Sequence, residues 1–145
     1  MAIKSKPMIR KKVNDKPAIK YIDKTLVLSP CYIGFCTTEK TFNKELKRLN
    51  VKGEWPSFLG KYGHATTHFL ERDKDVTCIV CLGSTKGRTR VQIHALLVHE
   101  AVHVWQQIKK TMGEPNPSDE FEAYALQNIC QSLFELYESS RNRGS

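Results

Sequence analysis

The chain has 145 residues, of which 40% are hydrophobic and 26% charged, a composition typical of one soluble globular domain. No apolar run reaches the roughly 18 to 20 residues that cross a bilayer, and none follows the basic N-terminus, so we expect neither a membrane span nor a secretory signal. The net charge is +8, and five cysteines without a secretory signal favour reduced thiols and a cytoplasmic location.

Most of the positive charge lies near the N-terminus. Residues 1–20 hold seven Lys or Arg and one Asp, a net charge of +6, which leaves +2 for the other residues. We expect residues 1–17 to form a flexible, mostly solvated arm. If the chain binds nucleic acid, the sequence favours this arm as the contact.

The first predicted elements are short strands and one surface helix. Residues 18–36 are rich in apolar and β-branched side chains, including the run Leu26-Val27-Leu28, and predict one or two strands. Phe42, Leu46 and Leu49 recur at helical spacing among charged residues and predict an amphipathic helix over 39–49.

A β-hairpin and a long helix follow. The segments His64–Glu71 and Asp75–Leu82 are extended in pattern and flank a charged turn, so they predict the hairpin. The run from Arg90 to Thr111 has no internal Gly or Pro and predicts the helix. Thr89 and Gln92 have the spacing of a capping box at its start.

A proline-rich link leads to the last predicted helix. Asn116 is the expected N-cap, Pro117 the first helical residue and Glu138 the approximate end. Residues 139–145 are predicted to be a polar tail, so the single domain spans 18–138. The order of elements predicts an α+β fold, in which a small, mainly antiparallel sheet packs against the two longer helices.

The long predicted helix carries His99-Glu100-Ala101-Val102-His103, an HExxH motif. Four residues turn a helix by about 400°, so both imidazoles lie on one face and can bind one metal ion. Glu100 lies about 60° round from His103, where a carboxylate can reach a metal-bound water without being a ligand. With five His and ten Glu in 145 residues, about 0.01 matches are expected by chance, so the motif predicts a zinc site.

A third ligand is sought downstream, where Glu120 is followed by Ala123 and Tyr124. With the HExxH motif, this pattern resembles the gluzincin metallopeptidases, in which a second helix supplies a glutamate from ExxSD, ExxAD or ExxAN. The resemblance covers about residues 75–137. It implies a zincin-like fold, one Zn²⁺ per chain held by His99, His103 and Glu120, and Glu100 as general base.

One position departs from the family pattern. The family commonly has Asp or Asn where this chain has Tyr124, and that residue hydrogen-bonds a ligand histidine. Tyr124 is therefore the candidate for this bond, and Tyr124, Tyr137 and His94 are the candidates for stabilising the oxyanion beside zinc. Residues 100–106 also look like small stand-alone zincin-like domains of bacteria or phages, which implies a minimal peptidase.

The implied function is hydrolysis of peptide bonds by a zinc-activated water, with a peptide or protein as substrate. In zincins the strand before the metal helix pairs with extended substrate, so the resemblance gives that role to residues 75–83. Two alternatives stay open. One is a zinc-stabilised binding module without turnover, and the other is a nucleic-acid-binding protein that uses the Lys-rich arm.

The cysteines offer a rival metal site. Cys78 and Cys81 form a CxxC, and with Cys31 and Cys36 they could make a four-cysteine zinc site. The CxxC lies in an apolar predicted strand, however, where a spacing of three directs the two sulfurs to opposite faces. We therefore expect these cysteines to be structural.

Overall fold

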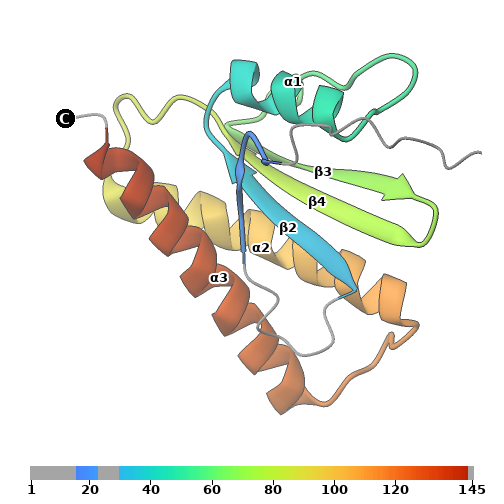
Figure 1. Cartoon of the computed structure of the whole chain (residues 1–145). Helices are drawn as coiled ribbons and strands as arrows, with labels where there is room; N and C mark the ends of the chain where they lie inside the picture. The colour runs from blue at the N-terminus through green and yellow to red at the C-terminus, as the bar shows by residue number, and fades with distance from the viewer. Residues whose placement is uncertain (1–15, 23–29, 144–145) are drawn as a thin grey trace, which may run out of the picture.

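A computed structural model describes residues 16–22 and 30–143. Its elements are β1 (Lys20–Tyr21), β2 (Cys31–Cys36), α1 (Glu39–Arg48), β3 (Ala65–Arg72), β4 (Asp75–Leu82), α2 (Arg90–Met112) and α3 (Asp119–Asn142). Within the described residues they form an α+β fold with a four-stranded mixed sheet and three helices (Figure 1). The predicted apolar run 26–28 and residues 1–15 of the predicted arm lie outside the described residues.

The strand order in the sheet is β1-β2-β4-β3. The predicted hairpin is confirmed, because β3 and β4 pair antiparallel from Ala65 opposite Leu82 to Arg72 opposite Asp75. Strands β1 and β2 are also antiparallel, whereas β2 and β4 are parallel. The parallel pairing was not predicted. It depends on the crossover through α1 and β3, and residue alternation within one strand carries no sign of that crossover.

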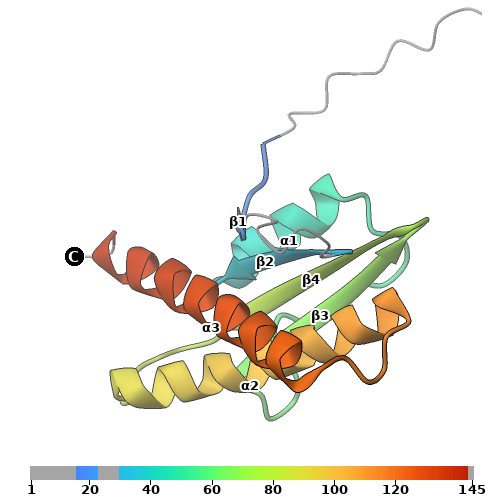
Figure 2. The ribbon, with the colours of Figure 1, turned by 90° about the horizontal axis from the view of Figure 1, so that it is seen from below.

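The helices cover both faces of the sheet, with α2 and α3 on one face and α1 on the other (Figures 1 and 2). Strand β4 alternates between the two cores. Cys78 and Val80 are buried against the α2 and α3 side, and Ile79 and Cys81 are buried against the α1 side. Burial on both faces explains why β4 is almost continuously apolar. It also confirms that the two CxxC sulfurs point to opposite faces.

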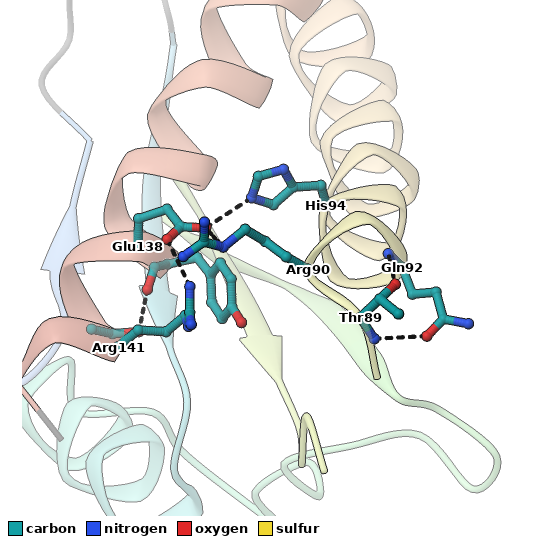
Figure 3. Close-up of polar contacts among 8 residues, drawn as sticks. Thr89, Arg90, Gln92, His94, Glu138 and Arg141 are labelled. Atoms are coloured by element: carbon teal, nitrogen blue, oxygen red, sulfur yellow. Dashed lines mark hydrogen bonds and ion pairs between the residues drawn. The ribbon is translucent and has the colours of Figure 1, made fainter. Parts of the chain in front are cut away.

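Helix α2 begins and ends close to its predicted bounds. The Thr89 hydroxyl accepts a hydrogen bond from Gln92 N, and the Gln92 side chain accepts one from Thr89 N, so the capping box is present (Figure 3). Gly113 ends the helix with φ 69°, a left-handed conformation that glycine adopts without a Cβ clash.

Helix α3 differs from its prediction at both ends. Its N-cap is Ser118 and not Asn116, because the Ser118 hydroxyl accepts from Phe121 N and three acidic residues in the first turn favour a start there. The helix also continues past Glu138 to Asn142, so most of the predicted tail is helical. A hydrogen bond from the Ser140 hydroxyl to Tyr137 O lies within this last part.

A buried carboxylate joins the N-terminal residues to α1. Glu45 is fully buried, and it accepts hydrogen bonds from Ala18 N at 2.7 Å and from the Tyr21 hydroxyl at 3.3 Å. The guanidinium of Arg48 forms an ion pair with the same carboxylate. A buried charge needs such partners, so Glu45 fixes residues 18–21 against the helix.

Candidate functional site

The HExxH motif lies in the middle of α2, at the boundary between its buried and exposed sides. Leu97, Glu100 and Val104 are buried, whereas His99 and His103 are exposed. Because a helix turns about 100° per residue, His103 lies about 60° and His99 about 100° round from Glu100. The two histidines therefore form an exposed edge next to the face that packs on the sheet.

The two imidazoles converge on one another. His99 Nε2 and His103 Nε2 are 3.1 Å apart, and the ring centroids are 4.8 Å apart. A tetrahedral zinc ion with Zn–N bonds of about 2.0 to 2.1 Å separates two nitrogen ligands by about 3.3 Å. The spacing of the pair is close to this value, so the pair fits two of the ligand positions of such an ion.

Gln106 orients one of these rings. Its side-chain oxygen lies 3.2 Å from His103 Nδ1, one helical turn further along α2. An amide oxygen only accepts, so this contact places the Nδ1 proton of a neutral His103 toward Gln106, and the Nε2 lone pair then faces His99 Nε2, with which it shares a hydrogen bond. A ligand histidine needs that tautomer.

Glu100 is held from the sheet. Its side chain is 5% exposed, and Oε2 accepts a hydrogen bond of 2.6 Å from the Thr67 hydroxyl of β3. Within residues 16–22 and 30–143, Oε1 has no hydrogen-bond partner. Thr67 thus holds one oxygen of the carboxylate in place.

Helix α3 packs on the side of α2 away from the histidines. Glu122 accepts hydrogen bonds from Trp105 Nε1 at 2.7 Å and from Lys109 Nζ at 3.0 Å. The bond from Trp105, with that from Lys109, lowers the pKa of Glu122 below its usual value. Trp105 lies about 160° round α2 from His103. The carboxylate that α3 directs at α2 is therefore that of Glu122, and it contacts the far side.

The predicted third ligand is not brought to the histidine pair. Glu120, Ala123 and Tyr124 share one face of α3, as expected, but all three are exposed and Tyr124 is 66% exposed. Within the part of the chain that the structure describes, no three His, Cys, Asp or Glu side chains are close enough to hold a metal ion together. The structure thus assembles His99 and His103 and leaves Glu120 apart.

The strand expected to pair with substrate is in the interior of the sheet. Residues 75–82 form β4, whose two edges are occupied by β2 and β3, so its backbone has no free edge for a peptide. Strands β1 and β3 are the edge strands of the described sheet, and Thr67 places β3 directly beside Glu100. The expectation that 75–83 pairs with substrate is therefore wrong in this fold.

His94 and the cysteines, whose side chains can also bind metals, lie in other parts of the fold. His94 Nε2 lies 3.1 Å from Glu138 Oε1 (Figure 3). The His94 ring also stacks on Phe134 at the interface of α2 and α3. All five cysteines lie within the described residues, and none of them forms a disulfide there. Cys36 Sγ and Cys81 Sγ are 3.5 Å apart beneath α1.

A cavity of about 530 Å³ opens beside the end of α1, on the other face of the sheet from α2, and His99 and His103 do not line it. Its lining residues are Pro17, Tyr21, Tyr32, Arg48, Leu49, Arg72, Asp73, Asp75 and Thr77. None of the described helices has the length and apolar character of a membrane span.

Two supporting residues were missed from the sequence. Gln106 is three residues after His103, and the i,i+3 rule could have found it. Thr67 is 33 residues before Glu100, and nothing in the local pattern of its strand distinguishes it from Thr66. Only the pairing of β3 at the sheet edge and its contact with α2 select it.

Comparisons of the chain with protein-family models, with curated proteins and with solved structures find no match.

Proposed function

We propose that the chain is a zinc-dependent peptidase in which His99 and His103 hold the ion and Glu100 is the general base. The observation that carries this proposal is the convergence of the imidazole nitrogens of two exposed histidines, 3.1 Å apart, beside the buried face of α2. When bound, zinc would lower the pKa of a coordinated water towards about 7 and polarise the scissile carbonyl.

The protein groups around the pair suit this reaction. Oε1 of Glu100 has no hydrogen-bond partner among the described residues, so it is the oxygen that would take a proton from water and deliver it to a leaving amine. The Thr67 hydroxyl restrains Oε2 and thereby the direction of the whole carboxylate. Gln106 keeps His103 in the tautomer that a ligand needs.

Glu120 remains our proposed third ligand, by resemblance to the gluzincins. Because it is exposed on the outer face of α3, it could join the histidines only if the first turns of α3 changed position. This movement of α3 leads to an expectation that separates the two ligand sets. Zinc binding should then shift the backbone NMR signals of residues in the first turns of α3, whereas binding by the histidine pair alone should shift only signals of α2 and β3.

The substrate class we propose is an extended peptide that pairs with β3. This strand has one edge free of other described strands, and it lies beside Glu100. Main-chain pairing gives affinity with little sequence preference, so we expect broad specificity.

One observation favours the alternative of a zinc-stabilised binding module without turnover. Glu100 is only 5% exposed and already engaged by Thr67, an arrangement that also suits a carboxylate with a purely structural role. Both functions require the histidine pair, and they differ in what Glu100 contributes.

The deciding experiment measures zinc content and peptide cleavage for Glu100→Gln, with Glu114→Gln in the exposed link between the helices as control. A positioned general base contributes about 10²-fold or more, so Glu100→Gln should keep its zinc and lose at least that factor in turnover, while the control keeps both. A broad peptide library with a mass-spectrometric readout is needed because specificity is open. Equal cleavage by the Gln variant, or none by zinc-loaded wild type, would refute the peptidase and favour the binding module.

The zinc assignment has its own test. His99→Ala and His103→Ala should each abolish stoichiometric zinc, whereas His64→Ala, which changes an exposed histidine away from the pair, should not. Full zinc content in the double variant of His99 and His103 would show that the ion is bound elsewhere.

A further inference from the structure

Positive charge gathers where α2 begins and α3 ends, and Figure 1 shows these two helix ends at the same side of the molecule. The group consists of Lys86, Arg88, Arg90, Arg141 and Arg143, which we call the basic end. Lys86 and Arg88 belong to the loop between β4 and α2, Arg90 to the first turn of α2, and Arg141 and Arg143 to the end of α3.

The basic end accounts for the net charge of the described chain. With Glu138, which lies among its side chains, it carries +4. The described residues contain seventeen Lys or Arg and thirteen Asp or Glu, which is also +4, so the remainder is neutral in sum. The opposite end of the helix pair is acidic, with Lys109 and Lys110 against Glu114, Asp119, Glu120 and Glu122. Charge is thus separated along α2 and α3.

Glu138 holds two of the guanidinium groups next to one another. Arg90 Nε lies 3.3 Å from Oε1, and Arg141 Nη1 lies 3.1 Å from Oε2, so two helices contribute to one cluster (Figure 3). His94 Nε2 also contacts Oε1, at 3.1 Å. The side chains of Arg90 and Arg141 are still 60% and 44% exposed. Their other N–H groups therefore face solvent in a restrained arrangement.

We propose that the basic end binds the phosphate backbone of nucleic acid. Four of its five cations are arginines, whose planar forks match phosphate oxygens in pairs. The capping box already uses the backbone N–H of Thr89 and Gln92, so binding would rest on side-chain charge and have little sequence preference. This surface belongs to the folded domain and is separate from the arm that the sequence favoured. The proposal does not depend on peptidase activity.

The test measures binding of the full chain to a fluorescein-labelled 20-base-pair DNA duplex by fluorescence anisotropy over a series of NaCl concentrations. The variant is Lys86→Glu with Arg88→Glu, because neither side chain has an ion pair among the described residues and the fold should be retained. The matched control is Lys44→Glu with Lys47→Glu, two exposed lysines of α1, which changes the net charge by the same amount.

The slope of log Kobs against log [NaCl] is negative, and each lost phosphate contact makes it shallower by about 0.9. The basic-end variant should therefore have a slope shallower by about 2 than the wild type and bind at least tenfold more weakly at low salt. The control should keep the wild-type slope. Equal losses in both variants would mean that net charge alone drives binding, and an unchanged basic-end variant would mean that the surface is not used. Either result overturns the proposal. So does binding to phosphatidylserine vesicles without binding to DNA, which would make the basic end a lipid contact.

Discussion

Thr67→Val tests whether the sheet holds the HExxH glutamate in place. Valine has nearly the same shape as threonine, so the change removes the hydroxyl and leaves little cavity. The hydroxyl donates a 2.6 Å hydrogen bond to Glu100 Oε2, and Glu100 is 5% exposed, so water can replace the lost donor only poorly. A hydrogen bond to a charged group contributes about 1.5 to 3 kcal/mol, and we expect Thr67→Val to lower the free energy of unfolding by about 2 kcal/mol.

Urea unfolding at neutral pH, without added metal, measures this loss independently of any enzymatic activity. Thr67→Ser restores the donor and removes only a methyl group, so it should lose about 1 kcal/mol or less. Thr77→Val is the matched control, because Thr77 is a half-buried threonine of β4 whose hydroxyl has no hydrogen bond among the described residues. Its effect should stay within about 0.5 kcal/mol.

A double variant isolates the contribution of the hydrogen bond between Thr67 and Glu100. In Glu100→Met the carboxylate is gone, so adding Thr67→Val should then cost close to nothing. If Thr67→Val is no worse than Thr77→Val, or if its full cost persists beside Glu100→Met, the argument that Thr67 acts through Glu100 is refuted.

Four further outcomes are expected. Glu45→Ala should lower the free energy of unfolding by about 3 kcal/mol, measured in urea. The change leaves the Arg48 guanidinium without its ion-pair partner and removes the hydrogen bonds that hold residues 18–21 against α1. Glu122→Gln should lower stability at neutral pH. The hydrogen bond from Trp105 lowers the pKa of Glu122 in the folded state, so the ionised carboxylate stabilises the fold at pH values above its unfolded pKa. This stabilisation is lost as the pH falls through the folded pKa, so the wild-type and variant stabilities should converge in acid. Cys36→Ala with Cys81→Ala should leave the zinc content of the protein unchanged by metal analysis, since both thiols are buried on the α1 side. Glu120→Ala should weaken zinc binding in a competition titration while Glu122→Ala does not, and the reverse order would discard the gluzincin frame.

The sequence predicted best those features that depend on neighbours along the chain. The capping box of Thr89 and Gln92, the stop at Gly113 and the hairpin all follow from residues within a few positions of one another. The start of α3 was misplaced because Asn116 followed by Pro117 has the pattern of an N-cap and a first helical residue. Ser118, two residues after Asn116, is the N-cap instead. The parallel pairing of β2 with β4 was missed because it depends on elements far apart in sequence.

The same limit explains the candidate site. The HExxH spacing determines the angles of His99, Glu100 and His103 around one helix, and the structure agrees with those angles. It does not determine which neighbour covers which side of that helix. The spacing of Glu120, Ala123 and Tyr124 points to Glu120 from residues on α3 alone. In the structure, Trp105 and Lys109 of α2 instead donate hydrogen bonds to Glu122.

The position of α3 therefore decides between two arrangements of a zinc site, one with Glu120 as a ligand and one without it. Trp105 Nε1, Lys109 Nζ and the Glu122 carboxylate would have to separate before the first turns of α3 could carry Glu120 towards the histidines. If Glu120 is a ligand, zinc binding and the Glu122 contacts oppose each other, and Glu122→Gln should tighten zinc binding while it weakens the zinc-free fold. If the histidine pair binds zinc without Glu120, the two are independent, and Glu122→Gln should leave zinc affinity unchanged. A zinc titration of this one variant beside wild type distinguishes the two arrangements without any assay of peptide cleavage.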